Sequence, residues 1–203
     1  MLMKKGLLIV ISGPSGAGKG TIYGKVTSQL PDMFKSISVT TREPREGEVE
    51  GINYYFRTNE EYQKMLSCGE FLETAKVYDH YYGTPAAPIF AEIEKGNDVI
   101  LEIDVQGAQS IKKLYPDSIA IFIMPPTFEI LEQRLRGRKT ENEESLALRI
   151  SSARDELLQY KLFDYFVVND DADIAAEKVL KILAAEKCDI SRNADFINDL
   201  LKK

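Results

Sequence analysis

The first residues with recognisable chemistry form a glycine-rich run near the start of the 203-residue chain. The sequence from Gly13 to Lys19 matches the pattern G-x-x-x-x-G-K, in which backbone N–H groups surround phosphate oxygens and the lysine reaches the β- and γ-phosphates. A hydroxyl follows one residue late, at Thr21, because Gly20 comes between. The run predicts a nucleoside triphosphate site, with Thr21 meeting a magnesium ion directly or through water. The residues of this phosphate loop are Gly13, Pro14, Ser15, Gly16, Ala17, Gly18, Lys19, Gly20 and Thr21.

The segments on either side of the phosphate loop are those that such a loop requires. The apolar run 7–11 predicts a buried strand, and the spacing of Ile22, Val26 and Leu30 predicts a helix over 21–30. A glycine-rich turn without a ligand is the alternative, and the order strand, loop, helix disfavours it.

The rest of the chain alternates between apolar runs and helical patterns. Further strands are expected at 99–103, 119–123 and 165–168, and helices at 88–95, 106–114, 128–135, 143–160 and 174–187. This alternation predicts an α/β fold in three layers, with a parallel sheet covered on both faces. Residues 36–88 differ, because they are rich in Tyr, Thr, Gly and charge, and we interpret them as a small mixed α+β lobe inserted into the core. The tail 190–203 has apolar residues at helical spacing; a short packed helix is favoured over a subunit contact.

Composition excludes several classes of protein. The net charge is 26 − 32 = −6, which argues against an extended nucleic-acid surface. One histidine and two distant cysteines leave no zinc constellation and no disulfide scaffold. The apolar run near the start is five residues long and is too short to span a bilayer. We expect a cytoplasmic protein that binds no membrane.

Charged residues outside the loop offer three further candidate sites. Arg42 and Arg45 could each fork onto a phosphate, although a solvated surface pair is the ordinary alternative. Glu102 and Asp104 occupy alternate positions at the end of the strand 99–103 and are expected to point the same way, toward the edge where ligands bind. Two solvated carboxylates are the alternative there. Four basic residues within 134–139, followed by acidic ones, are typical of a solvated flap.

Five segments, taken in order with the phosphate loop, resemble the guanylate kinases. They are residues 38–54, 71–73, 81–85, 101–107 and 137–149, and the resemblance covers about residues 7–170. It implies Mg²⁺-dependent phosphoryl transfer from ATP to GMP, giving ADP and GDP. It also implies one domain over 1–203, with a core of about 1–35, 89–130 and 156–203, a GMP-binding lobe of about 36–88 and a helical lid of about 131–155.

The resemblance assigns roles on the GMP side. Arg42 and Arg45 would hold the GMP phosphate together with the hydroxyls of Tyr54 and Tyr82. The Glu73 carboxylate would accept from the guanine N1–H and 2-amino groups, and Ser38 and Thr84 would meet the 6-oxo group. Asp104 would assist on the base side, and Glu102 would lie near GMP or the Mg²⁺ water shell. The full GMP-binding set is Ser38, Arg42, Arg45, Glu48, Tyr54, Glu73, Tyr82, Thr84, Glu102 and Asp104.

On the ATP side, the resemblance adds three arginines and an asparagine to the phosphate loop. Arg138, Arg149 and Arg134 would approach the transferring phosphoryl group, and Asn169 would border the adenine. Lys19, Arg42, Arg138 and Arg149 are the expected catalytic residues.

Three other functions fit the sequence less well. A kinase for another small phosphate acceptor is disfavoured because Ser38, Glu73 and Thr84 are all present. A non-catalytic guanylate-kinase-like module that docks protein partners is disfavoured because Gly18 and Lys19 are intact. A P-loop GTPase would need an NKxD-type motif, which the sequence lacks. The sequence does not decide between a monomer and a homo-oligomer.

Overall fold

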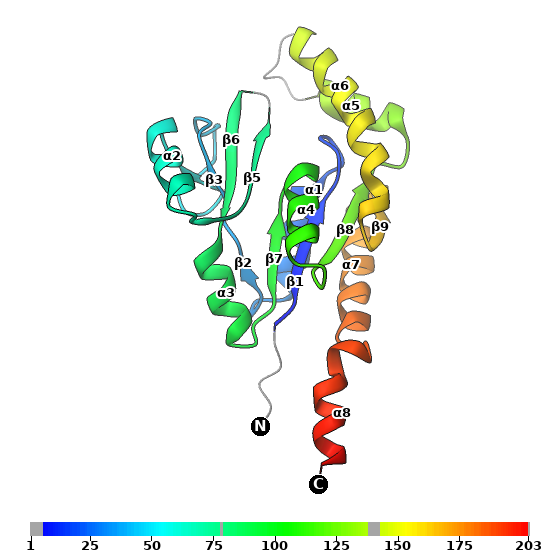
Figure 1. The fold of residues 1–203 in the computed structure, drawn as a ribbon. Helices are drawn as coiled ribbons and strands as arrows, with labels where there is room; N and C mark the ends of the chain where they lie inside the picture. The colour runs from blue at the N-terminus through cyan, green and yellow to red at the C-terminus, as the bar shows by residue number, and fades with distance from the viewer. Residues whose placement is uncertain (1–5, 78, 138–142, 203) are drawn as a thin grey trace.

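The core of the molecule is a five-stranded parallel sheet. The computed structural model describes residues 6–77, 79–137 and 143–202. Strands β1 (Leu8–Ser12), β2 (Phe34–Lys35), β7 (Val99–Glu102), β8 (Ile119–Met124) and β9 (Tyr165–Val168) lie in the order β2-β7-β1-β8-β9 (Figure 1). The four expected strands are present; β2 is an additional edge strand of two residues, too short to leave a periodic pattern.

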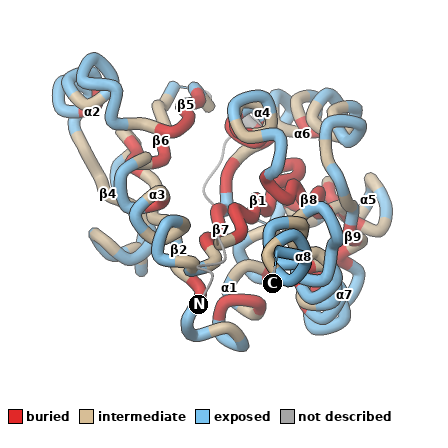
Figure 2. Tube along the Cα trace, turned by 60° about the horizontal axis from the view of Figure 1, so that its bottom comes forward, coloured by how far each residue is buried: buried red, intermediate tan, exposed pale blue. Residues whose placement is uncertain are grey.

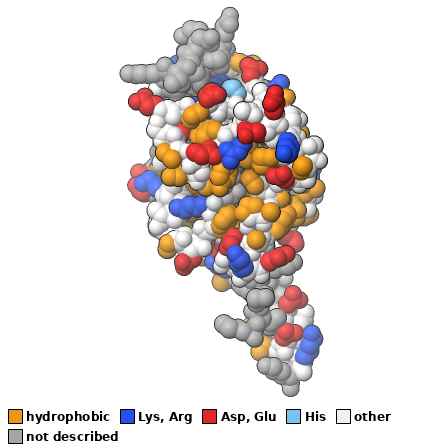
Figure 3. Space-filling model, turned by 90° about the vertical axis from the view of Figure 1, so that its left-hand side faces the viewer, with side chains coloured by type: hydrophobic (Ala, Val, Ile, Leu, Met, Phe, Trp, Pro, Cys, Tyr) orange, Lys and Arg blue, Asp and Glu red, His pale blue; other side chains and the backbone are white. Residues whose placement is uncertain are grey.

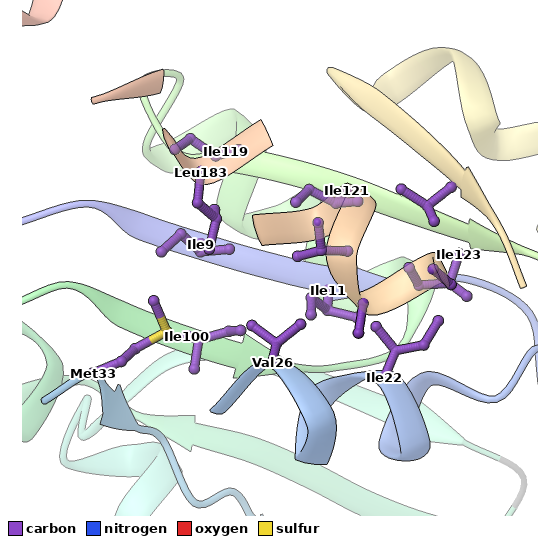
Figure 4. Packing of buried hydrophobic residues seen from close by; sticks show 14 of the residues in the cluster. Ile9, Ile11, Ile22, Val26, Met33, Ile100, Ile119, Ile121, Ile123 and Leu183 are labelled. Carbon is purple, nitrogen blue, oxygen red and sulfur yellow. The ribbon is translucent and has the colours of Figure 1, made fainter. Parts of the chain in front are cut away.

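Helices cover both faces of this sheet, as expected. Because successive strand residues point to opposite faces, Ile9 and Ile11 pack with α1 (Lys19–Gln29) and α7 (Ala172–Glu186), through residues such as Val26 and Leu183 (Figure 4). Leu8 and Val10 face the other way, against α3 (Ala86–Glu94) and α4 (Val105–Leu114). The three-layer α/β fold is therefore confirmed. Figure 2 shows burial concentrated in β1, β7 and β8 at the centre.

A second, mixed sheet lies beside the core in the order β4-β3-β6-β5. It consists of β3 (Val39–Thr40), β4 (Tyr55–Phe56), β5 (Phe71–Val77) and β6 (His80–Pro85), with α2 (Asn59–Ser67) next to it. Strands β5 and β6 pair antiparallel, with Glu73 opposite Thr84. The turn before α2 is fixed by a capping box between Thr58 and Glu61. Acidic and basic side chains are interspersed over the face that carries α2 and α3 (Figure 3).

On the other side of the core stand α5 (Phe128–Arg136) and α6 (Glu143–Leu158), which is followed by the 3-10 helix η1 (Gln159–Leu162). Leu131 and Leu135 of α5 pack with Leu146 and Ala153 of α6 in a separate small core. Figure 1 shows this pair and the β5–β6 hairpin on opposite sides of the strand ends of the core sheet.

The C-terminal tail is where the expectation of packing is wrong. A second 3-10 helix, η2 (Ser191–Asn193), leads into α8 (Ala194–Leu201), so the helical spacing was interpreted correctly. However, α8 has no buried residue, and Phe196 and Leu200 are largely exposed. The helix continues away from the body of the molecule (Figure 1). Among the described residues no helix combines the length and apolarity that a bilayer crossing needs.

Candidate active site

The phosphate loop connects β1 to α1 in a backbone conformation that depends on its glycines. Gly13, Gly16 and Gly18 all have positive φ, and a Cβ on Gly13 would lie 2.2 Å from the carbonyl oxygen of Ile123. Lys19 donates from Nζ to the carbonyls of Gly13, at 2.7 Å, and Pro14, at 3.2 Å. The lysine ammonium therefore lies against the phosphate loop, held by the carbonyls at its start.

Asn169 is buried behind the phosphate loop and is not exposed at the surface. Its side-chain Nδ2 donates to the carbonyl of Ala17 at 2.7 Å. A Cβ on Gly18 would approach the same nitrogen to 2.3 Å. Its hydrogen bond supports the loop from within the core, and its place beside the adenine stays a prediction.

Arg134 approaches the same region from α5. Its Nη2 donates to the backbone carbonyl of Asn169 at 3.0 Å. Its Nη1 is buried and, within the described residues, has no hydrogen-bond partner. A buried guanidinium donor without a partner favours an anion nearby. Arg149 lies on α6 and is partly buried, whereas Arg138 falls outside the described residues.

In the small lobe, the structure brings together Ser38, Glu73 and Thr84. Thr84 donates from Oγ1 to Glu73 Oε1 at 2.5 Å, and the hydroxyls of Ser38 and Thr84 are 3.4 Å apart. Glu73 is only 6% exposed. Burial raises the pKa of its carboxyl to about 7; the Thr84 hydrogen bond opposes this rise and the charge of Asp104 adds to it.

Gly107 completes the surroundings of Glu73 and was not expected from the sequence. It lies in the first turn of α4, where a Cβ would come within 2.5 Å of Glu73 Oε2. The carboxylate can thus lie against the helix backbone only because residue 107 is glycine. A glycine inside a helical pattern signals such a close approach, and that signal was available in the sequence.

Glu102 and Asp104 do not act as a pair on one strand. Strand β7 ends at Glu102, and Asp104 is the N-cap of α4, accepting from the N–H groups of Gln106 and Gly107. The expectation that strand alternation points both carboxylates the same way is therefore wrong. Glu102 is exposed, and both its carboxylate oxygens lie 3.5 Å from the position of a Cβ on Gly20. This places it beside the phosphate loop.

The Arg42 guanidinium is held in place by several neighbours. Its Nη2 donates to both carboxylate oxygens of Glu48, at 2.9 and 3.0 Å, and its Cζ lies 5.5 Å from the centre of the Tyr54 ring. Burial alone would lower the pKa of Arg42, but the hydrogen bonds with Glu48 and Tyr82 outweigh it and raise the pKa. Burial likewise pushes the pKa of Glu48 up, and the hydrogen bonds from Arg42 and the Arg45 N–H bring it below its usual value. The Arg45 side chain itself is exposed.

Two tyrosines border this arginine. The rings of Tyr54 and Tyr82 meet edge to face with centres 6.0 Å apart. Burial raises the pKa of Tyr54 to about 12, with the charge of Glu102 contributing in the same direction. The Tyr54 phenol therefore remains protonated near neutral pH and can donate to an anion.

A cavity of about 500 Å³ lies between β5, the start of α4 and the C-terminal half of α6. Lys76, Asp104 and Glu156 are among the residues that line it. Glu156 was not expected from the sequence: its Oε2 accepts from the backbone N–H of Ser15 in the phosphate loop at 3.0 Å, across 141 residues of chain.

The phosphate loop between β1 and α1 of a parallel sheet places the molecule in the class of P-loop proteins. The family model described as guanylate kinase matches residues 5–186. The guanylate kinase of Caldanaerobacter subterraneus is 52% identical over 195 residues, which cover 96% of this chain and 95% of that protein. That of Clostridioides difficile is 45% identical over 203 residues, covering 100% and 99%. The chain belongs to the guanylate kinase family.

A solved structure agrees with this assignment. The crystal structure of guanylate kinase from Anaplasma phagocytophilum superposes with a TM-score of 0.80 at 34% identity, covering 94% of this chain and 91% of that one. The resemblance found in the sequence and the expectation of an enzyme of this family are therefore confirmed. The alternative of a non-catalytic docking module is not favoured.

Proposed function

We propose that the chain transfers the γ-phosphoryl group of ATP to GMP, giving ADP and GDP. The observation that carries this proposal is the contact of the half-buried Ser38 with the buried Thr84–Glu73 pair on the small sheet. Guanine presents donors at N1 and the 2-amino group, which suit a carboxylate, and an acceptor at the 6-oxo group, which suits a hydroxyl. Adenine reverses the 6-position and lacks the 2-amino group, so buried partners would be left unpaired at about 1–3 kcal/mol each.

The GMP phosphate would bind beside Arg42. The ion pair with Glu48 and the contact with Tyr54 hold this guanidinium in place before substrate arrives. We therefore assign Glu48 to orienting Arg42 and the loop at Arg45, rather than to GMP itself. Arg45, Tyr54 and Tyr82 would supply the remaining donors.

The ATP phosphates would lie in the phosphate loop, in contact with Lys19, with Asn169 holding the loop from behind. Within the described part of the chain, Nη1 of Arg134 has no partner, which supports a role for that residue in charge neutralisation; Arg138 and Arg149 are proposed to join it. Phosphoryl transfer needs in-line positioning and cancelled charge more than it needs an acid or base. Residues 36–88 and 131–155 would serve as the GMP lobe and the lid of one domain, excluding water around the reacting groups.

A magnesium ion fits the donors beside the phosphate loop. The Glu102 carboxylate next to Gly20 and the hydroxyl of Thr21 are hard oxygen ligands of the kind that Mg²⁺ takes. The described residues contain no cluster of three or more carboxylate, histidine or cysteine ligands. Mg²⁺ commonly binds through one or two protein oxygens, water and substrate phosphates, so such a cluster is not needed. When bound with ATP, the ion would neutralise phosphate charge.

The acceptor specificity tests the proposal. ADP release from ATP and Mg²⁺ is measured with GMP, AMP, CMP and UMP in turn. Turnover with GMP and none of comparable rate with the others is expected. Binding of GMP without turnover of any acceptor would contradict the proposal and return the docking module to consideration. A cytoplasmic setting is proposed as well, and Cys68 and Cys188, both free and exposed, are compatible with it.

A further inference from the structure

The Glu156 carboxylate stands where an anion is expected to bind. Ser15 belongs to the phosphate loop, whose N–H groups surround phosphate oxygens in proteins of this class. Here the N–H of Ser15 donates to Glu156 Oε2 at 3.0 Å. One donor of the loop is thus used by a side chain of the protein.

Charges of both signs surround the Glu156 carboxylate. Burial raises the pKa of its carboxyl, while the Ser15 hydrogen bond and the charge of Lys19 act in the opposite direction. Asp104 and Asp155 face it with like charge. Further negative charge at the loop would therefore weaken the contact of this carboxylate with the Ser15 N–H, because like charges at short range repel strongly where solvent is limited.

The contact also joins two parts of the fold. Glu156 lies two residues before the end of α6, which packs on α5 through Leu146 and Ala153. The same α5 lies against the phosphate loop, because a Cβ on Gly16 would be 3.1 Å from Cγ of Leu135. The Ser15–Glu156 hydrogen bond thus links the phosphate loop to α6, most of which belongs to the proposed lid.

We propose that Glu156 competes with the ATP phosphates for the phosphate loop, so that ATP binding displaces its carboxylate and releases the C-terminal end of α6. The inference rests on the proposed function, since it takes ATP as the ligand of the loop. Glu156 is a positioning residue in this scheme: it ties α6 to the loop and lowers the affinity for ATP until the phosphates replace it.

The test is the affinity for ATP with Mg²⁺, measured by calorimetry without GMP, for the wild type, Glu156→Gln and Asp155→Asn. Glutamine keeps the size and a neutral acceptor but removes the charge that competes with phosphate. We expect Glu156→Gln to bind ATP about tenfold more tightly, which corresponds to about 1.4 kcal/mol. GMP affinity should stay within about twofold of the wild type, less than 0.5 kcal/mol. Asp155 is exposed and adjacent, so Asp155→Asn removes a nearby negative charge without removing the acceptor of the Ser15 hydrogen bond. Any change in its ATP affinity should stay well below the tenfold gain of Glu156→Gln.

The direction of the change separates this role from a structural one, because loss of a structural contact would weaken ATP binding. Equal or weaker ATP binding by Glu156→Gln overturns the inference, as does a gain shared by Asp155→Asn or by GMP. Glu156→Ala removes the acceptor altogether and is expected to tighten ATP binding too, so a misfolded glutamine variant does not prevent the test. A wild type that binds no ATP would overturn the proposed function and this inference together, whereas normal wild-type binding without a gain overturns this inference alone.

Discussion

Replacing Gly107 by alanine should damage guanine recognition without touching the phosphate loop. The new Cβ would lie 2.5 Å from Oε2 and 3.0 Å from Cδ of Glu73, closer than atoms can remain. The neighbouring atom is the buried carboxylate rather than a flexible surface group, so the carboxylate must move. Its hydrogen bond from Thr84, at 2.5 Å, and its alignment with the guanine edge would be lost together.

The size of the effect follows from the hydrogen bonds at stake. A hydrogen bond to a charged group contributes about 1.5–3 kcal/mol, so kcat/KM for GMP should fall between about 10-fold and 150-fold. The Kd for ATP should change less than about twofold, under 0.5 kcal/mol, because the loop is untouched.

Gly24→Ala is the matched control for this substitution. Gly24 also lies inside a helix, α1, and a Cβ there would meet nothing within 4 Å. Gly24→Ala should gain helix stability of up to about 1 kcal/mol from the replacement of glycine, whereas in Gly107→Ala the clash with Glu73 opposes that gain. Steady-state kinetics with GMP, together with thermal melting, separates the two effects. If Gly107→Ala keeps the wild-type kcat/KM for GMP, or if ATP binding falls equally, the placement of Glu73 against α4 does not determine guanine recognition.

Three further predictions follow from the site. Because guanine donors need an ionised acceptor and the pKa of Glu73 is about 7, kcat/KM for GMP should rise with pH through about 7 and then level off; pH profiles of the wild type and Glu73→Gln check this, and an equally steep rise in the variant would contradict it. Lys19→Ala should lower turnover by about 100- to 1,000-fold, the usual effect of losing one charge-stabilising donor, while leaving GMP binding nearly unchanged; parallel loss of both in kinetics and calorimetry would refute this division. Asn169→Ala should destabilise the fold by about 1–3 kcal/mol and weaken ATP binding, because the carbonyl of Ala17 loses its buried donor; urea unfolding and ATP titration measure both, and unchanged stability would show that the hydrogen bond does not support the loop.

Local patterns were enough to predict the core, because the central strands β1, β7 and β8 are buried on both faces over most of their length and appear as unbroken apolar runs. The glycine motif, placed between such a strand and a helix, located the phosphate loop. Strand β2 was missed because Phe34–Lys35 has no room for a pattern. The β5–β6 hairpin was expected only as part of a mixed lobe, since β5 mixes buried and exposed positions irregularly and its register shifts between Phe71 and Glu73.

The contacts that organise the site were beyond sequence reasoning for a different reason. Ser15 with Glu156 and Ala17 with Asn169 are joined across 141 and 152 residues, and no periodicity encodes such pairs. In the tail, the apolar spacing around Phe196 correctly predicted a helix. Such spacing does not show whether the surface that would cover the apolar face belongs to the same chain.

The central claim is transfer of the terminal phosphoryl group of ATP to GMP. The most direct test supplies ATP labelled in its γ-phosphate, with Mg²⁺ and GMP, and follows the label by chromatography. If the chain catalyses this transfer, the label appears in GDP in an amount equal to the ADP formed. Label released as inorganic phosphate, or retained in ATP while GMP remains unchanged, would contradict it.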